Sequence, residues 1–127
     1  MKNIITYGTF DTFHYGHLEL LIRASEMGDR LFVGVSTDEF NLLKGKKCSF
    51  PYNKRLEWIQ SIKFVYQVFG ESTWEQKSDD IKKYNISTLV MGDDWKGKFD
   101  KFNHLCEVKY LSRTPQISST NIKSFIK

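Results

Sequence analysis

The most informative segment of the chain for chemistry is the ten-residue run from Gly8 to His17, G-T-F-D-T-F-H-Y-G-H. It stands where an apolar run that contains Ile4 and Ile5 gives way to a helix-like pattern. A strand, a tight turn and a helix N-terminus direct backbone N–H groups and the positive end of the helix dipole toward an anion. His14 and His17 add two imidazoles at that point. The segment therefore indicates a phosphate that undergoes reaction.

The spacing of the two histidines does not match a zinc site. They lie three residues apart, whereas two zinc ligands on one helix are usually four apart, as in H-E-x-x-H, and no such acidic partner is present. The alternative is that both residues are structural, one as a loop histidine and the other as a helix N-cap. The G-T-F-D sequence that precedes them argues against this alternative. Gly8 and Gly16 would let a nucleotide approach the backbone. Phe10 is either a core residue or a nucleotide contact.

A short basic cluster, Lys44, Lys46 and Lys47, follows the second predicted strand. Such clusters are commonly solvated surface, but this one falls in a loop where a triphosphate can lie. Compact ammonium groups suit phosphate oxygens without requiring a planar fork. We expect Lys46 to contact the triphosphate and Lys44 to contact a second substrate. Lys77 is the one charged side chain of a later helix that we also single out.

The segment Arg113–Thr120, R-T-P-Q-I-S-S-T, opens the last predicted helix. Hydroxyl groups and backbone N–H groups at a helix start bind phosphate, and an arginine such as Arg113 can hold a phosphate with two parallel hydrogen bonds. Ordinary N-capping by Ser118 or Ser119 is the structural alternative. The two roles do not exclude each other.

Carboxylates accompany these phosphate-binding candidates. Asp93 and Asp94 follow the fourth predicted strand, and Asp11 lies in the first loop. Mg²⁺ needs few protein ligands when substrate phosphates supply the others, so Asp93 and Asp94 are candidate metal ligands, with Asp11 as a second candidate. Turn and cap chemistry is the alternative for Asp93 and Asp94.

The order of the elements predicts where these residues meet. Apolar runs and helical patterns alternate along the chain, which favours βαβ units and a doubly wound, Rossmann-like α/β fold with a parallel five-stranded sheet and helices on both faces. Ligands of such sheets lie beyond the carboxyl ends of the strands, and four polar loops follow strand ends here. Gly28 stands where a helix C-cap is expected. The predicted strands are Asn3–Tyr7, Arg30–Ser36, Phe64–Phe69, Ser87–Met91 and Glu107–Leu111; the predicted helices are Leu18–Met27, Asn53–Ile62, Trp74–Tyr84 and Ser119–Ile126; Thr37–Ser49 is a predicted loop, and Gly92–Lys101 is a loop that turns helical near its end.

Length and composition limit the possible functions. The 127 residues suffice for a single domain, 1–127, with a core of its own. The net charge of +4 fits an anionic ligand, whereas the long Lys/Arg runs that favour nucleic acid are missing. Cys48 and Cys106 form no close pair, which favours a reduced, cytoplasmic chain. Because there is neither an apolar stretch of about 18 residues nor a signal-peptide core, we expect no membrane insertion.

These motifs resemble those of a known family. The run Gly8–His17 resembles G-T-F-D-x-x-H-x-G-H, the signature of the cytidylyltransferases in the nucleotidyltransferase α/β phosphodiesterase superfamily, and Arg113–Thr120 resembles the second signature, R-T-x-G-I-S-T-T. The whole chain is similar to the branch of that family that acts on glycerol 3-phosphate. Three further segments carry this closer resemblance: S-T-D-E-F-N at 36–41, W-E-Q-K at 74–77 and M-G-D-D-W-K-G-K-F-D at 91–100.

The resemblance implies transfer of a cytidylyl group from CTP to glycerol 3-phosphate with Mg²⁺, which gives CDP-glycerol and pyrophosphate. It also implies a homodimer whose product feeds teichoic acid or capsule polymers. Lys44 and Lys77 would face the glycerol phosphate. The catalytic residues would be His14, His17, Lys46 and Arg113, and the CTP contacts would include these together with Thr9, Phe10, Asp94, Thr114, Ile117, Ser118, Ser119 and Thr120.

The chain departs from the family pattern at several positions, and three of them change the chemistry of the side chain. Gln116 stands where the family has glycine, which puts a close backbone approach there in doubt. Lys63 and Tyr66 fall in K-F-V-Y, where the family usually reads R-Y-V-D. An acid and a guanidinium are thereby lost.

The chemistry of this reaction is consistent with the residues present. A phosphate monoester is largely dianionic at neutral pH, so in-line attack on the α-phosphate needs positioning and charge stabilisation more than a strong base. We expect His14 and His17 to donate to the α- and β-phosphates in the transition state. The alternatives are a cytidylyl- or adenylyltransferase for another phosphorylated acceptor, such as phosphoethanolamine or phosphocholine, and a catalytically silent CTP-binding module.

Overall fold

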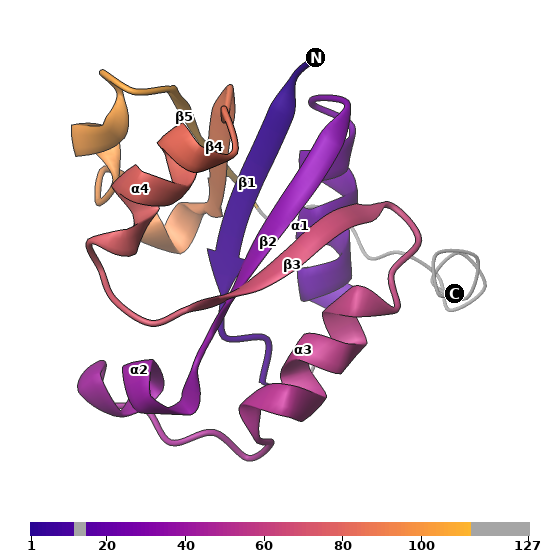
Figure 1. The fold of residues 1–127 in the computed structure, drawn as a ribbon, viewed down its shortest axis with the longest axis vertical. Helices are drawn as coiled ribbons and strands as arrows, with labels where there is room; N and C mark the ends of the chain where they lie inside the picture. Colours follow the sequence, from indigo (N-terminus) through magenta and orange to yellow (C-terminus); the bar gives the residue numbers. More distant parts are fainter. Residues whose placement is uncertain (12–14, 113–127) are drawn as a thin grey trace.

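The structure, a computed structural model, describes residues 1–11 and 15–112 and contains a five-stranded parallel sheet of order β3-β2-β1-β4-β5 (Figure 1). The chain runs outward from the central strand β1 to β3 on one side, then crosses to β4 and β5 on the other. The predicted α/β class and doubly wound sheet are therefore confirmed. The strands are β1 (Asn3–Gly8), β2 (Arg30–Ser36), β3 (Val65–Glu71), β4 (Thr88–Gly92) and β5 (Glu107–Leu111).

The central strands are buried on both faces, as parallel sheets generally are. β1 pairs with β2 in unbroken register from Asn3 opposite Arg30 to Gly8 opposite Val35. Because successive side chains of a strand point to opposite faces, Ile4 packs into one core cluster and Ile5 into the other, both without solvent exposure.

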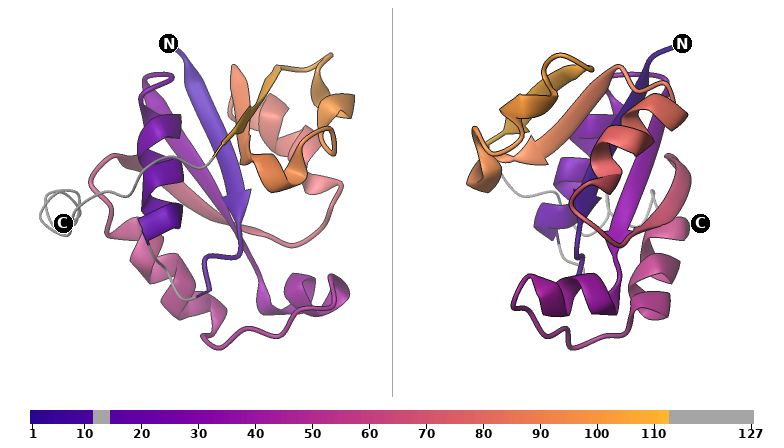
Figure 2. Two further views of the ribbon diagram at one scale, coloured as in Figure 1. Left: turned by 180° about the vertical axis from the view of Figure 1, so that it is seen from behind. Right: turned by 60° about the vertical axis from the view of Figure 1, so that its left-hand side comes forward.

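Helices cover the two faces of the sheet unequally (Figures 1 and 2). α1 (Tyr15–Ser25) and α3 (Tyr52–Gln60) pack on one face, where Leu21 and Ile59 are fully buried. The other face is covered by α4 (Gln76–Lys83) and by two short 3₁₀ turns, η1 (Asp93–Trp95) and η2 (Asp100–Phe102). This second face is rich in aromatic rings, among them Phe32, Phe99 and Phe102.

The predicted loop Thr37–Ser49 is partly wrong, because it contains the helix α2 (Asp38–Leu43). Thr37 caps this helix through its Oγ1, which accepts from the backbone N–H of Phe40 at 3.1 Å. Acidic residues in the first turn add a favourable interaction with the helix dipole. A threonine followed by two acidic residues is a helix-start signal in the sequence, but the lysines that follow made a loop the preferred prediction.

Gly28 does not act as the predicted C-cap. Helix α1 ends at Ser25, and Gly28 is not among the described glycines with a positive φ. A Cβ built on it would lie 2.8 Å from the carbonyl oxygen of Lys2 and 2.7 Å from the side chain of Ile4. Glycine is required there because the chain passes close against β1.

The remaining elements lie near their predicted positions. β2 and β5 have the predicted bounds, and β3 ends at Glu71, two residues later than predicted. α4 begins at Gln76, so Trp74 precedes the helix, and the loop after β4 contains the two 3₁₀ turns. The predicted helix Ser119–Ile126 lies outside the described residues.

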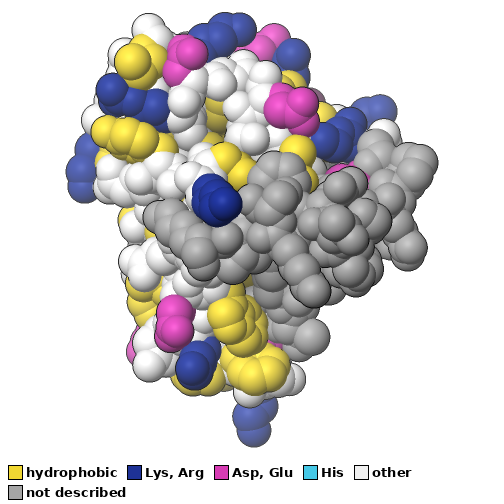
Figure 3. Space-filling model, turned by 90° about the vertical axis from the view of Figure 1, so that its right-hand side faces the viewer, with side chains coloured by type: hydrophobic (Ala, Val, Ile, Leu, Met, Phe, Trp, Pro, Cys, Tyr) yellow, Lys and Arg dark blue, Asp and Glu magenta, His cyan; other side chains and the backbone are white. Residues whose placement is uncertain are grey.

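Two surface observations bear on partners. On the face shown in Figure 3, the Lys and Arg side chains of the described residues are scattered among acidic and apolar ones. In the same described part of the chain, none of the helices has the length and apolar character that would let it cross a bilayer.

Candidate active site

The carboxyl ends of β1 and β4 and the loop after β2 meet at a cleft of about 540 Å³. This is the switch point of the sheet, where parallel α/β proteins bind ligands. His14, Arg113, Thr114, Ile117, Ser118, Ser119, Thr120 and Gln116 lie outside the described residues. The described site residues predicted from the sequence all line the cleft: Thr9, Phe10, Asp11, His17, Lys44, Lys46, Lys77 and Asp94.

The loop after β1 is shaped by Phe10, which has a positive φ of 54° and a buried ring. A left-handed backbone conformation at a residue other than glycine raises the free energy of the folded state by about 1–3 kcal/mol, and it persists only where packing enforces it. The ring lies against Gly8, where a Cβ would come within 2.8 Å of it, and edge-on to His17 with centroids 5.4 Å apart. Gly8 thus makes room for the chain's own phenyl ring, a different reason from the predicted approach of a nucleotide. Phe10 is a core residue that also lines the cleft.

His17 lies in the first turn of α1, two residues after Tyr15 begins the helix. Its side chain is partly buried and faces the cleft beside the Phe10 ring. An imidazole in this place can donate to an oxygen bound at the helix N-terminus, where the helix dipole already favours negative charge.

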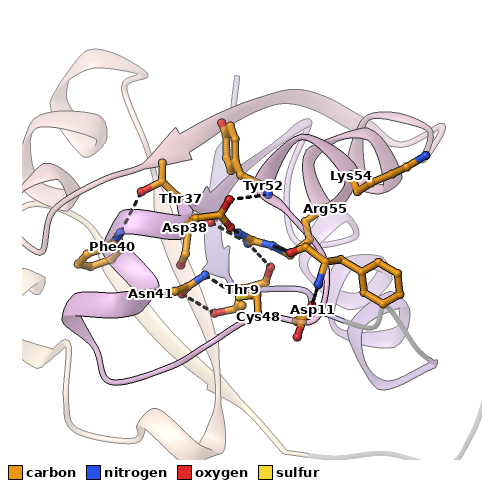
Figure 4. Close-up of polar contacts among 12 residues, drawn as sticks. Thr9, Asp11, Thr37, Asp38, Phe40, Asn41, Cys48, Tyr52, Lys54 and Arg55 are labelled. Atoms are coloured by element: carbon orange, nitrogen blue, oxygen red, sulfur yellow. Dashed lines mark hydrogen bonds and ion pairs between the residues drawn. The ribbon is translucent and has the colours of Figure 1, made fainter.

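Arg55, a fully buried arginine of α3, was not predicted from the sequence. Its guanidinium donates to the carbonyl oxygens of Thr9 at 2.9 Å, Ser36 at 2.7 Å and Phe50 at 3.0 Å (Figure 4). It also pairs with Asp38 at 2.7 Å and holds the pKa of that carboxyl below its usual value. Arg55 therefore joins the loop after β1 to the start of α2.

The segment that carries Lys44, Lys46 and Lys47 is called the lysine loop. Asp11 and Asn41 hold the lysine loop against the loop after β1 (Figure 4). The Asp11 carboxylate accepts from the backbone N–H groups of Ser49 at 2.8 Å and Phe50 at 3.0 Å. Thr9 Oγ1 donates to Asn41 Oδ1 at 3.2 Å, and Asn41 Nδ2 contacts Cys48 Sγ at 3.0 Å. The loop that carries the three lysines is thus fixed at both ends.

The lysines of this loop differ in exposure. Lys44 is partly buried; its Nζ donates to Ser36 Oγ at 3.0 Å and lies 4.6 Å from the centre of the Phe40 ring. Burial lowers the pKa of Lys44. Lys46 and Lys47 line the cleft with exposed side chains. Their ammonium groups reach solvent and suit a mobile polyanion.

Lys77 is 2% exposed, although it is charged and lies at the cleft. Its Nζ pairs with the buried Glu71 carboxylate and lies over three rings: Tyr7 at 4.5 Å, Phe99 at 5.1 Å and Trp74 at 5.2 Å. We call these four partners the ammonium box. Burial raises the pKa of Glu71, an effect that the charge of Lys77 opposes.

A second buried pair supports the box from behind. Tyr7 Oη donates to Asp80 Oδ2 at 2.8 Å, and burial raises the pKa of both groups. Gln76 Nε2 also donates to Asp80 Oδ2 at 3.1 Å. The Tyr7 ring is therefore fixed in its place against the Lys77 ammonium. Neither Tyr7 nor Glu71 was predicted, since nothing in their local sequence marks them.

The carboxylates at the cleft are compatible with a metal that arrives on a substrate. Asp94 is exposed in η1, and Asp11 lines the same cleft. Within residues 1–11 and 15–112, no three His, Cys, Asp or Glu residues are grouped so as to hold a metal ion by themselves. Hard oxygen ligands in small number fit Mg²⁺ that is bound chiefly by phosphates.

The two described departures from the family pattern lie elsewhere. Tyr66 is 56% exposed on β3, where the Arg30 guanidinium lies 4.7 Å from the centre of its ring. Lys63 lines a second hollow together with Phe64. Neither residue belongs to the lining of the cleft in the described part of the chain.

A parallel sheet with a helix N-terminus, an imidazole and lysines at its switch point defines a nucleotide-binding α/β protein of the nucleotidyltransferase type. Comparison with known proteins gives the family: the profile of the family named "Cytidylyltransferase-like" matches residues 5–125, and the chain belongs to this family.

Individual proteins agree with this placement. The chain is 57% identical to the glycerol-3-phosphate cytidylyltransferase of Bacillus spizizenii, over 97% of this chain and 95% of that one. It is 53% identical to the enzyme of the same name from Staphylococcus aureus, over 97% and 93%. A lipopolysaccharide core biosynthesis protein from Thermoplasma volcanium has the same fold, with a TM-score of 0.79 at 24% identity over 91% of this chain and 99% of that chain.

Proposed function

We propose that the protein transfers a cytidylyl group from CTP to glycerol 3-phosphate and releases pyrophosphate. The observation that carries the proposal is one cleft lined by an imidazole and by several lysines. His17 lies in the first turn of α1, Lys46 lies in the loop after α2, and Lys44 and Lys77 share the ring of Trp74. The proposed function also rests on 57% identity to a glycerol-3-phosphate cytidylyltransferase.

The reaction follows from charge and position. A phosphate oxygen of glycerol 3-phosphate forms a bond to the α-phosphorus of CTP, and the bond from that phosphorus to the bridging oxygen of the β-phosphate breaks. Pyrophosphate leaves with the bonding electrons. The attacking dianion needs no strong base, so the protein contributes orientation and hydrogen-bond donors for the developing charge.

The triphosphate half of the cleft is proposed to use His17, Lys46 and the N-terminus of α1. The imidazole of His17, steadied by the Phe10 ring, donates to a phosphate oxygen, and the exposed Lys46 neutralises the triphosphate. His14 remains a proposed partner of His17. Arg113, Thr114, Ile117, Ser118, Ser119 and Thr120 remain proposed CTP contacts.

Mg²⁺ is a proposed cofactor, with Asp94 and Asp11 as the carboxylates available at the cleft. Bound to the triphosphate, it supplies further neutralisation of negative charge. The Asp11 carboxylate already accepts two backbone hydrogen bonds, so its first contribution is to hold the lysine loop.

Three further properties are proposed from the resemblance: a homodimer, a cytoplasmic location and a product that feeds teichoic acid or capsule synthesis. Cys48 and Cys106 are both free thiols, as expected for a reducing compartment. The proposed partners are CTP, glycerol 3-phosphate and a second copy of the chain, with neither nucleic acid nor membrane among them.

The direct test is to incubate the protein with CTP, Mg²⁺ and glycerol 3-phosphate and to measure CDP-glycerol by mass and pyrophosphate by a coupled assay. We expect both products in equal amounts. ATP in place of CTP, and phosphoethanolamine or phosphocholine in place of glycerol 3-phosphate, serve as competing substrates. A clear preference for one of these, or CTP binding by calorimetry without pyrophosphate, contradicts the proposal.

A further inference from the structure

The ammonium box has the chemistry of a receptor for an organic cation. Three aromatic faces lie 4.5–5.2 Å from one ammonium nitrogen, and a carboxylate completes the enclosure. Cations are attracted to aromatic faces at such distances, and methylated or primary ammonium ligands are recognised in this way. Here the cation is Lys77 of the chain itself.

We propose that Lys77 is a built-in occupant of an ammonium site, and that it thereby excludes acceptors whose phosphate carries an ammonium tail. Phosphoethanolamine and phosphocholine belong to that class, whereas a polyol phosphate has an uncharged tail. This specificity role rests on the proposed function. The ammonium site does not rest on the proposed function, because the site depends only on the geometry of the box.

Burial makes the site dependent on a cation. Glu71 is 2% exposed, so removal of the Lys77 ammonium would leave a buried carboxylate without a counterion. That carboxylate must then take up a proton or an external cation. The box is open to such a cation from the cleft, because Lys77 and its four partners all belong to the cleft lining.

The surrounding charges favour an anionic head group with an uncharged tail. Besides Lys77 and Glu71, the box is approached by Asp80, which is bound to Tyr7, and by Lys44, whose Nζ lies 5.8 Å from the centre of the Trp74 ring. Lys44 and Lys77 thus share the Trp74 ring. Two ammonium groups beside one ring attract phosphate and repel the ammonium group of a ligand.

The site itself is tested by cation binding to variants that empty the box. We expect Lys77→Ala, and likewise Lys77→Ser, to bind methylammonium chloride saturably in the millimolar range by calorimetry and to gain thermal stability from it, with sodium chloride as the ionic control. Lys77→Ser empties the box in the same way and provides a second variant in case Lys77→Ala fails to fold. Lys77→Met, which refills the box with an uncharged chain, and the unmodified protein should bind none. Equal binding by all four proteins, or none by a folded Ala or Ser variant, overturns the proposal.

The specificity role is tested by competing acceptors. We expect the ratio of kcat/KM for phosphoethanolamine to kcat/KM for glycerol 3-phosphate to rise about tenfold or more in Lys77→Ala, the factor that one desolvated cation–aromatic interaction supplies. The ratio should not rise in Lys77→Met. Added methylammonium should partly restore the use of glycerol 3-phosphate by Lys77→Ala. An unchanged ratio in Lys77→Ala refutes the specificity role even when the unmodified protein makes CDP-glycerol. Absence of CDP-glycerol from the unmodified protein refutes the proposed function, while the calorimetry still decides the ammonium site.

Discussion

Individual residues of the cleft divide the handling of negative charge according to their exposure. Lys46 is exposed, His17 and Lys44 are partly buried, and Lys77 is enclosed by its own partners. Exposed ammonium groups attract a polyanion through solvent, whereas partly buried donors act more strongly over short distances because the local dielectric is lower. Among the cleft residues that the structure describes, His17 and Lys44 are therefore the best placed to stabilise a transition state.

Replacement of His17 by alanine is predicted to lower kcat by about 10²–10³, by analogy with the removal of one oxyanion donor. The phosphate oxygen would lose a donor held rigidly beside the Phe10 ring. Steady-state pyrophosphate release measures the effect, and His104→Ala serves as the control because His104 is exposed and does not line the cleft. Near-normal turnover of His17→Ala would rule out the catalytic role.

The lowered pKa of Lys44 predicts an alkaline loss of activity. Because burial favours the neutral amine, Lys44 should lose its proton at a pH below the ordinary lysine pKa of 10.5. The value of kcat/KM for glycerol 3-phosphate should therefore begin to decrease at a pH below 10.5. In Lys44→Arg the guanidinium keeps its proton, so the alkaline fall should move to higher pH. The pH profile of both proteins checks this.

The contribution of Lys44 to the free energy of unfolding should increase over the same pH range in which the activity decreases. Between the lowered folded pKa of Lys44 and its higher unfolded pKa, the unfolded chain binds more protons, so this group makes folding more favourable as pH rises. A melting curve at each pH therefore separates loss of the cation from unfolding. An alkaline fall that is identical in Lys44→Arg would assign it to another group.

At the scale of elements, the site depends on the connection between α3 and two loops. Arg55 lies four residues before Ile59 on α3, and both side chains are fully buried, so Arg55 occupies the buried face of its helix. A charged residue in an apolar stripe was the sequence signal for this role. Its partners were not predictable, because they are backbone carbonyls from three distant segments.

Arg55→Ala is predicted to destabilise the protein by about 3–5 kcal/mol, since it leaves buried carbonyl oxygens without donors and breaks an ion pair. Urea unfolding followed by circular dichroism measures the loss. Lys54→Ala on the same helix is the matched control and should change stability by about 0.5 kcal/mol or less, because Lys54 is exposed. Equal losses in the two variants would show that Arg55 does not join the loops.

Replacement of the α2 cap is a milder change of the same kind. Thr37→Ala removes the oxygen that accepts from the Phe40 N–H and should cost about 1 kcal/mol, whereas Thr37→Ser retains a capping oxygen. Chemical denaturation of the three proteins gives the comparison. A Ser variant as unstable as the Ala variant would argue against capping by the hydroxyl.

For the whole molecule, the alternation of apolar runs predicted the sheet and its active edge, because parallel strands must be buried on both faces and their carboxyl ends lie together. The lining residues Asp11, Lys46 and Asp94 were found from their place after strand ends. Glu71 and Tyr7 were not, since their roles arise only when β1, β3 and α4 come together around Lys77. Tertiary contacts of this kind leave no local spacing to detect.

One cleft should hold a nucleotide phosphate and an acceptor phosphate side by side. A crystal structure of the protein with CDP-glycerol and Mg²⁺ would show whether it does. We predict a diphosphate within about 3.2 Å of the His17 imidazole on one side and of the Lys44 ammonium on the other, with the glycerol toward Trp74. Ligand bound elsewhere, or a diphosphate that His17 faces away from, would contradict the account.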